Sequence, residues 1–420
     1  MRRIFWFSPL PPARTDVANY TLRLAQPLQR QAEVVFCFPG DTPPNITLPA
    51  RRARSLRAAE LNGADLCIYH LGNNAQFHAE IWDCAERHPG LVVLHDRALH
   101  ECYLGRRAGS DSARYLREMA GWYGEAGYQT ARAVRAGLCR PADQATAYPL
   151  YEAALVQALA VVTHNSEVAR ELRQRFPLLP VLDLPLPFPR PPEIPVTRRG
   201  SDKVIRLIAF GFMSRNRRLV EFLVAWADSP WRESFVLDLV GELQDAERVE
   251  QTLQQTGLHE RVNRHGFVSD AELDMLLARS DLALNLRNPT MGEASGTQLR
   301  IWANRLPSVV SDIGWYSRLP DDCVLKVDTA REQAELQVLL ARLAQREIDL
   351  RALGEAGWER LGEHDPVRYV EALLAWLGRE RWQWSRLWCA RRQIETLARH
   401  RADLLPADAP LTLPAVLTQL

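Results

Sequence analysis

Short apolar runs alternate along this chain with longer stretches in which apolar residues recur every three or four positions. Runs of the first kind are typical of buried strands, and the second pattern is typical of amphipathic helices. In the first half, helical patterns fall at residues 17–28, 77–87 and 112–157. The strands predicted there are residues 3–7, 34–38, 66–69, 91–94 and 161–163. This alternation predicts a doubly wound, parallel sheet.

A proline-rich stretch separates this series from a second one. The prolines between Pro185 and Pro195 allow neither a helix nor a central strand, so they predict a semi-rigid linker. Beyond the linker, helical patterns fall at residues 217–226, 246–255 and 296–304. The strands predicted there are residues 204–210, 235–240, 281–286 and 308–311.

We therefore predict an α/β chain with two facing Rossmann-like domains. The first domain covers residues 1–185, the linker 186–200 and the second domain 201–365. A further helix is predicted from Pro366 to about residue 380, and a tail rich in tryptophan and arginine occupies residues 381–420.

Composition narrows the class of protein. The 420 residues carry 52 Lys and Arg against 51 Asp and Glu, and a net charge of +1 gives no bulk attraction to nucleic acid. The seven cysteines form no C-x-x-C pair, which argues against a zinc site or a disulfide framework and favours a reducing cytoplasm. No segment reaches the roughly 20 apolar residues of a membrane helix, so any membrane contact is expected to be peripheral.

Polar residues follow several predicted strands, where such folds bind ligands. Thr15 and Asp16 follow the first strand, in a loop that either meets a phosphate or is a plain turn with Asp16 as helix cap. His95 follows the fourth strand and either contacts a ligand hydroxyl, with Asp96 orienting its ring, or is structural. His70 is a weaker candidate of the same kind. These histidines lack a metal-ligand spacing, so no metal is expected.

The second domain carries the stronger signals. Arg215 and Arg217 follow its first strand, and guanidinium groups pair with phosphate oxygens in bidentate fashion, although a solvated basic turn is the alternative. Ser295, Gly296 and Thr297 lie at the start of a predicted helix, where amides and dipole favour an anion.

The stretch from Pro289 to Pro307 contains that helix start and is the most informative part of the sequence. Glu293 precedes it and is placed to accept hydrogen bonds from ligand hydroxyls. The loop is more polar and richer in glycine than a simple strand-to-helix turn requires. It therefore favours a binding site over a plain connection.

Taken together, these residues resemble glycosyltransferase family 4, a retaining family of GT-B fold, and its bacterial branch that acts in polysaccharide and lipopolysaccharide assembly. Residues 288–296 and 309–316 carry the resemblance, which extends over roughly residues 3–378 and is supported by 69–74 and 94–96. It implies that the nucleotide binds the second domain and the acceptor the first. It also implies that the helix at 366–380 crosses back onto the first domain.

The resemblance also implies roles for single residues. His95 matches the histidine near the transferred sugar, Glu293 the glutamate near the sugar ring, and Arg217 the basic residue on the donor diphosphate. Gly266 and Phe267 match the segment beside the nucleobase.

Several positions depart from the family pattern. Glu293 falls one residue later than the family's glutamate, and Thr15 and Asp16 stand where a glycine is common. Arg300, a further candidate for the donor site, stands where the family has a second glutamate that contacts the ribose. Phe212 stands where an arginine is usual. These departures leave open a catalytically decayed GT-B protein that binds nucleotide sugars or serves as a scaffold. A sugar phosphorylase or an epimerase ranks lower, because a phosphorylase needs cofactor-binding lysines and this chain is poor in lysine.

The favoured function is thus a metal-independent hexosyltransferase without a cofactor. It would move a sugar from a nucleoside-diphosphate sugar to a hydroxyl of a glycan or lipid-linked acceptor in the cytoplasm. For peripheral contact with the inner membrane, the sequence offers a basic cluster whose alternative is a solvated face, namely Arg51, Arg52, Arg54 and Arg57.

Overall fold

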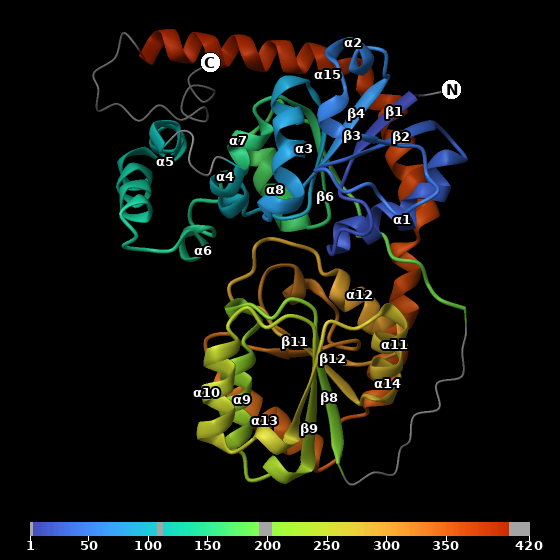
Figure 1. Cartoon of the computed structure of the whole chain (residues 1–420), viewed down its shortest axis with the longest axis vertical. Coiled ribbons are helices and arrows are strands. Elements are labelled where there is room, and N and C mark those ends of the chain that lie inside the picture. Colours follow the sequence, from blue (N-terminus) through green and yellow to red (C-terminus); the bar gives the residue numbers. More distant parts are fainter. Residues whose placement is uncertain (1–2, 107–111, 193–203, 403–420) are drawn as a thin grey trace. The chain divides into compact units, whose positions relative to one another are not determined.

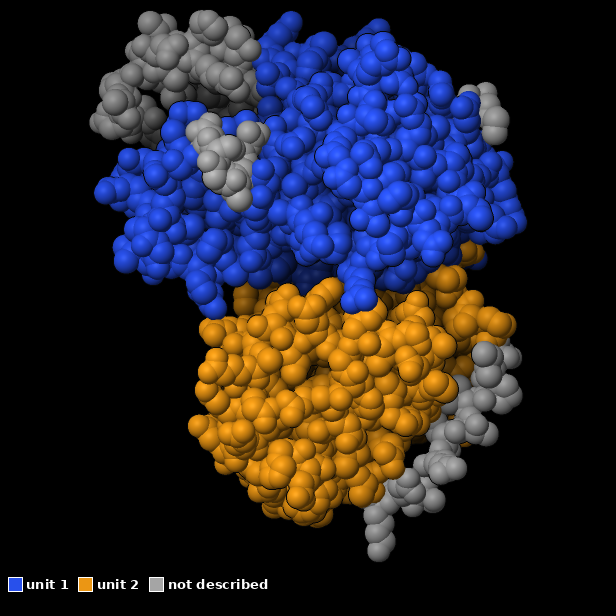
Figure 2. Space-filling view, in the orientation of Figure 1, with its two compact units in different colours: residues 1–187, 291–294, 366–420 blue, residues 188–290, 295–365 orange. Residues whose placement is uncertain are grey.

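The computed structural model describes residues 3–106, 112–192 and 204–402. The chain divides into two compact units, coloured separately in Figure 2. Unit 1 comprises residues 1–187, 291–294 and 366–420, and unit 2 comprises residues 188–290 and 295–365. Residues 193–200 of the predicted linker lie outside the described residues, and residues 184–192 form neither helix nor strand.

Unit 1 is built on a seven-stranded sheet in the order β3-β2-β1-β4-β5-β6-β7, with every neighbouring pair parallel. Its strands are β1 (Arg3–Phe7), β2 (Glu33–Phe38), β3 (Ala50–Arg52), β4 (Leu66–Leu71), β5 (Gly90–Leu94), β6 (Ala158–Thr163) and β7 (Val181–Asp183). Its helices are α1 (Asp16–Gln29), α2 (Ala58–Leu61), α3 (Ala75–Arg87), α4 (His100–Arg106), α5 (Ser112–Arg135), α6 (Pro141–Gln144), α7 (Tyr151–Leu155), α8 (Ser166–Arg175) and α15 (Pro366–Ala402).

Helices cover both faces of this sheet, with α3 and α8 on one side and α1 and α15 on the other (Figure 1). A strand buried on both faces needs apolar residues at every position rather than at alternate ones. Strands β4 and β5 accordingly have all their residues buried. The main core of the unit packs between the sheet and the layer of α3, α4, α7 and α8.

Unit 2 repeats the plan with a six-stranded parallel sheet in the order β10-β9-β8-β11-β12-β13. Its strands are β8 (Ile205–Phe210), β9 (Phe235–Val240), β10 (Val262–Gly266), β11 (Leu282–Asn285), β12 (Ser308–Ser311) and β13 (Leu325–Val327). Its helices are α9 (Leu219–Ala227), α10 (Ala246–Thr256), α11 (Asp270–Arg279), α12 (Gly296–Ala303), α13 (Glu332–Ala344) and α14 (Leu350–Arg360). Figure 1 shows α9, α10 and α13 on one face and α11, α12 and α14 on the other. Two Rossmann-like domains are therefore confirmed.

Helix α15, which follows unit 2 in the sequence, belongs to unit 1. Near its start, Tyr369 accepts a hydrogen bond from Tyr20 of α1 at 2.6 Å. The sequence places the end of this helix near residue 380, but the helix continues through the tryptophan- and arginine-rich tail to Ala402. Figure 1 shows that the helix changes direction along its length. Arginine is a good helix former, so the composition of the tail does not end the helix. Tryptophans of the tail pack against unit 1, and the helix therefore continues past Gly378.

One arginine holds the second part of α15, the part that follows Gly378, in place. Arg391 is buried, and its Nη2 donates to the carbonyl oxygens of Val156 and Ala158 at 2.9 Å and of Leu155 at 3.4 Å. These carbonyls lie at the end of α7 and the start of β6, where helix carbonyls have no partner within the helix.

Replacing Arg391 by methionine is expected to release this part of α15. The change leaves buried carbonyls unpaired, which costs about 1–3 kcal/mol for each group left unsatisfied. Limited trypsin digestion should then cleave at Arg379 and Arg381 much faster than in the original chain. Arg386→Met alters an exposed arginine of the same helix and should leave the digestion rate elsewhere on α15 unchanged. If trypsin cleaved the two variants equally slowly, Arg391 would not be what holds this part of the helix in place.

Candidate functional site

Glycines end three adjacent strands of unit 2. Gly211, Gly241 and Gly266 follow or close β8, β9 and β10, and all have positive φ. A Cβ on Gly241 would lie 2.2 Å from the carbonyl oxygen of Gly211, so no side chain fits there. The backbones therefore approach closely at the carboxyl edge of the sheet, where open α/β folds bind their ligands.

The start of α12 lies at the same edge. Ser295 caps the helix, and its Oγ accepts the N–H of Gln298 at 3.1 Å. The N–H groups of Gly296 and Thr297 have no partner among the described residues, because the first turn of a helix has none of its own. Both residues are partly exposed. This helix start can therefore accept an anion.

A buried polar network supports this helix start. Asn285, at the end of β11, donates through Nδ2 to Gln298 Oε1 at 2.9 Å and to Ser295 Oγ at 3.3 Å. Gln298 in turn donates to Ser308 Oγ of β12 at 2.8 Å. Asn285 and Gln298 are not among the residues predicted from the sequence. The available signal was the asparagine at the end of an otherwise apolar strand, since a buried amide needs partners.

Arg217 lies beside this network and is buried, with 9% of its surface exposed. Its guanidinium donates to Asn285 Oδ1 at 2.9 Å and to Thr297 Oγ1 at 3.4 Å. It also donates to the carbonyl oxygens of Phe210 and Phe212. Arg217 therefore links the ends of β8 and β11 to the start of α12 and brings a positive charge to that helix start.

The other arginine of this loop is placed differently. Arg215 is about half exposed and forms an ion pair with Asp245 at 2.6 Å. It lies in the same short 3-10 turn as Arg217, yet it does not enter the interior of unit 2. Both arginines are candidates for the diphosphate contact on sequence grounds, but their environments in the structure differ.

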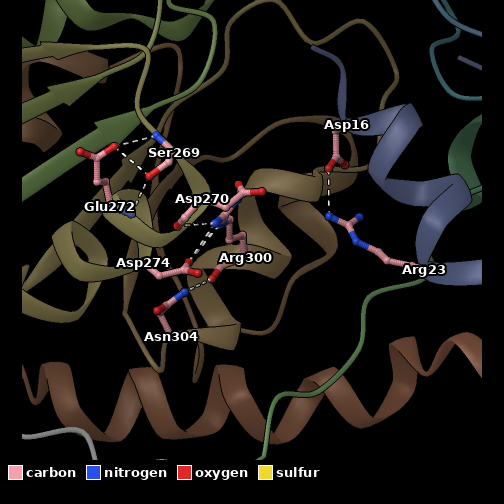
Figure 3. Close-up of polar contacts among 8 residues, drawn as sticks. All are labelled: Asp16, Arg23, Ser269, Asp270, Glu272, Asp274, Arg300 and Asn304. Carbon is pink, nitrogen blue, oxygen red and sulfur yellow. Dashed lines mark hydrogen bonds and ion pairs between the residues drawn. The ribbon is translucent and has the colours of Figure 1, made fainter. Parts of the chain in front are cut away.

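Arg300 is bound by acidic residues of α11 (Figure 3). Its guanidinium bonds Asp270 Oδ1 at 2.6 Å and Asp274 Oδ1 at 2.9 Å. In the same helix, Asn304 donates to the carbonyl oxygen of Arg300 at 3.0 Å, and Ser269 and Glu272 form a capping box at the start of α11. Arg300 thus links α12 to α11, an interaction that local sequence patterns do not predict.

Phe267 follows β10 and is 61% exposed, which is unusual for an aromatic ring in a short loop. The strand that leads to it is fixed by Asp238, a buried acid of β9. Asp238 accepts bonds from His265 Nε2 at 2.7 Å and Asn263 Nδ2 at 3.1 Å. The strand that ends at Gly266 is therefore held in place by hydrogen bonds, and the aromatic ring of Phe267 that follows it is exposed.

Glu293 belongs to the short segment 291–294 that groups with unit 1. Its carboxylate accepts the backbone N–H of Met291 at 2.7 Å. Gly292 between them has positive φ, which a residue with a side chain would rarely adopt. The segment is therefore a tight turn closed by Glu293.

In unit 1, His95 lies in a cluster of rings at the carboxyl ends of β4, β5 and β6. His95 Nε2 bonds His70 Nδ1 at 2.9 Å, and its ring centroid lies 5.6 Å from that of His164 and 4.9 Å from that of Tyr20. Asp96 accepts the backbone N–H of Asn73 at 2.8 Å. The His95 ring thus contacts other rings, whereas Asp96 binds the backbone of the neighbouring loop.

This environment disfavours charge on the histidines. Burial and the neighbouring imidazoles hold the pKa of His70 and of His95 well below the usual value. Burial lowers the pKa of His78 to about 4. Nε2 of His70 is buried and has no hydrogen-bond partner among the described residues. His95 therefore is neutral near pH 7 and can accept or donate a hydrogen bond as an uncharged ring.

Thr15 and Asp16 begin α1. Thr15 is the N-cap and accepts the N–H of Val17 through Oγ1 at 3.4 Å. Asp16, which the plain-turn alternative took as the cap, instead accepts a hydrogen bond from Arg23 of the same helix at 3.0 Å (Figure 3). Threonine takes the cap because it is in the extended conformation that precedes a helix.

The arginines of the basic cluster of unit 1 all take part in ion pairs. Arg51 and Arg57 pair with Glu60, while Arg52 and Arg54 pair with Asp41. Four arginines therefore share two carboxylates on and beside the edge strand β3. The observed pairing agrees with a solvated face more than with a lipid-binding patch.

Metal sites and membrane spans are both absent from the described part of the chain. No group of three or more His, Cys, Asp or Glu side chains there is arranged to hold a metal ion. No helix within the described ranges is long and apolar enough to cross a membrane.

No protein-family model and no curated protein sequence matches this chain. Solved structures do match it. HepE of Anabaena in complex with UDP is 15% identical with a TM-score of 0.59, and the match covers 90% of this chain and 100% of HepE. Sucrose-phosphate synthase from Thermosynechococcus elongatus is 15% identical with a TM-score of 0.61, over 91% of this chain and 99% of the other.

A third match is WaaG, described as a glycosyltransferase involved in lipopolysaccharide biosynthesis. It is 17% identical with a TM-score of 0.54, over 88% of this chain and 98% of WaaG. At these identities the likeness concerns the fold. With two Rossmann-like units and a helix that ends on unit 1, this chain has the GT-B fold of glycosyltransferases.

Proposed function

We propose that this chain is a glycosyltransferase whose unit 2 binds a nucleoside-diphosphate sugar. One observation carries the proposal: the N–H groups of Gly296 and Thr297, unpaired among the described residues, lie beside the buried guanidinium of Arg217 at the start of α12. A diphosphate needs several N–H donors and compensating positive charge, and this edge supplies both. Structural neighbours solved with UDP and with UDP-glucose support the choice of ligand class.

In the proposed reaction, the acceptor hydroxyl attacks the anomeric carbon on the face from which the diphosphate leaves, so that the configuration is retained. The leaving phosphate takes the proton of the acceptor hydroxyl. Arg217 and the dipole of α12 stabilise the negative charge that develops on the diphosphate, without a metal ion. We assign the sugar-contacting roles to His95 and Glu293, and the nucleobase contact to Gly266 and Phe267.

Arg215 and Arg300 have smaller roles in this proposal. Arg215 lies near the site but is paired with Asp245, and Arg300 acts through α11, to which Asp270 and Asp274 bind it. We assign Thr15 and Asp16, at the start of α1, to the binding of the acceptor. The acceptor that we propose is a hydroxyl of a glycan or a lipid-linked glycan in cell-surface polysaccharide synthesis, a choice that the lipopolysaccharide role of WaaG supports.

A panel of nucleotide sugars tests the donor site. At a ligand concentration of about 100 times Kd, binding stabilises the folded protein by about 2.7 kcal/mol. We expect one of the UDP-, GDP-, ADP- and dTDP-sugars to raise the melting temperature by several degrees, and the same compound to be consumed when an acceptor is present. A panel without any effect would refute the donor site and favour the scaffold alternative. Binding without transfer would favour a decayed enzyme.

Glu293→Gln separates catalysis from binding. The amide keeps the shape of the side chain but loses its charge, so the variant is expected to bind the nucleotide sugar normally and to lose about 100-fold or more in kcat, as for an electrostatic group in other enzymes. Glu247→Gln, on the exposed surface of α10, is the matched control and should retain full activity. A Glu293→Gln variant with normal turnover would contradict the assigned role.

A further inference from the structure

The outer side of the second part of α15 presents arginine and tryptophan together. Arg379, Trp382, Arg386, Cys389 and Gln393 are exposed and follow one another at helical spacing, so they lie on one side of the helix. We call them the outer stripe. Trp382 is 65% exposed, and the Arg386 guanidinium lies 5.7 Å from the centre of its ring.

The opposite side of the same segment is fixed to unit 1. Trp384 is buried with its ring 4.9 Å from that of Trp376, and Arg391 is bonded to the carbonyls at the start of β6. Arg381 donates to the carbonyl oxygen of Asp65, directly before β4, at 2.8 Å. The outer stripe is therefore held in a defined orientation across the amino ends of the strands.

The charge of this segment is mainly positive. Residues 379–394 contain five arginines and a single acid, Glu380, and the outer stripe contains no acid. An exposed tryptophan between arginines suits the interface between water and lipid, where the indole enters the headgroup layer and guanidinium groups meet anionic phosphates. An acidic protein surface would use the charges but would leave the indole without a matching apolar layer.

We propose that the outer stripe of α15 binds the surface of a bilayer that contains anionic phospholipid. The contact lies at the amino edge of the unit 1 sheet, so the carboxyl edge with His95 stays uncovered. The interaction recruits the protein to the lipid surface without occupying its candidate site. It does not depend on the proposed transferase activity, so a failure here would leave that proposal untouched.

Co-sedimentation with vesicles tests this. The full chain should bind an equimolar mixture of phosphatidylcholine and phosphatidylglycerol at low salt and should not bind pure phosphatidylcholine. Each arginine near an anionic surface contributes about fivefold to partitioning. The double variant Arg379→Gln with Arg386→Gln should therefore partition about 25-fold more weakly, and Trp382→Ala several-fold more weakly. None of these side chains packs in the core, so folding is expected to be unchanged.

A matched pair on α5 removes the same charge elsewhere in unit 1. Arg132 and Arg135 are both exposed, and the double change to glutamine should leave vesicle binding unaltered. Equal losses in the two double variants would overturn the assignment to α15, and so would an original chain that does not bind anionic vesicles. If size-exclusion chromatography without lipid shows a dimer that Trp382→Ala dissociates, the stripe binds a second copy and the proposal is wrong.

Discussion

Arg217→Ala is expected to destabilise unit 2 and to abolish nucleotide binding together. The guanidinium donates to four oxygen atoms, of Phe210, Phe212, Asn285 and Thr297, in a site with little exposure. Leaving buried acceptors unpaired costs about 1–3 kcal/mol each, so a loss of about 3 kcal/mol or more is expected. For a domain of this size the melting temperature then falls by about 6–12 °C. Differential scanning calorimetry with and without nucleotide measures both effects.

Arg215→Ala provides the control, because it removes the same side chain two residues away. Its exposed ion pair with Asp245 contributes at most about 1 kcal/mol, so the melting temperature should hardly change. Arg217→Lys separates charge from geometry: it should recover part of the nucleotide affinity but little of the stability, since an ammonium cannot reach all four acceptors. An Arg217→Ala variant with the original melting temperature and affinity would show that Arg217 is dispensable.

The central strands could be predicted from sequence, but the edge strands could not. All nine predicted strands are present, and the four that were missed, β3, β7, β10 and β13, are the edges of the two sheets. A central strand is buried on both faces and must be apolar throughout. An edge strand is partly exposed and can be polar: in β10 only Val262 is buried, and β3 contains two arginines. Apolar runs therefore cannot find such strands.

The candidate site divides in the same way. The start of α12 was predictable, because serine, glycine and threonine at the start of a helix cap it and leave its first N–H groups accessible. The partners of its arginines were not. Arg215 and Arg217 are two residues apart, and only the fold decides that one enters the interior while the other meets Asp245. Arg300 depends on two acids of another helix, more than 25 residues earlier in the chain. Such pairings depend on how helices pack, which local patterns do not encode.

Three histidines of unit 1, His70, His78 and His95, are expected to make that unit sensitive to acid. Histidines that are buried in the neutral form take up protons more readily in the unfolded chain, so stability is complete above the unfolded pKa of about 6.5 and falls as the pH drops toward the folded pKa. For His78, whose pKa is lowered to about 4, the loss between pH 7 and pH 5 is about 2 kcal/mol. His70 and His95 act in the same direction, because burial also lowers the pKa of each.

Native-state hydrogen exchange can resolve this loss by unit. Peptides of β4 and β5 should lose about 2 kcal/mol of protection or more between pH 7 and pH 5 relative to peptides of β9 and β11, after correction for the intrinsic exchange rate. His78→Gln tests the origin of the effect, since a glutamine amide can still donate to the His70 carbonyl that His78 Nδ1 bonds at 3.0 Å, yet does not titrate. The variant should lose about 2 kcal/mol less protection than the original chain. His259→Gln removes an exposed histidine of unit 2 and should change nothing. If β4 and β5 kept their protection at pH 5, the cluster would have to accept protons without opening, and a neutral His95 at the proposed sugar site would lose its physical basis.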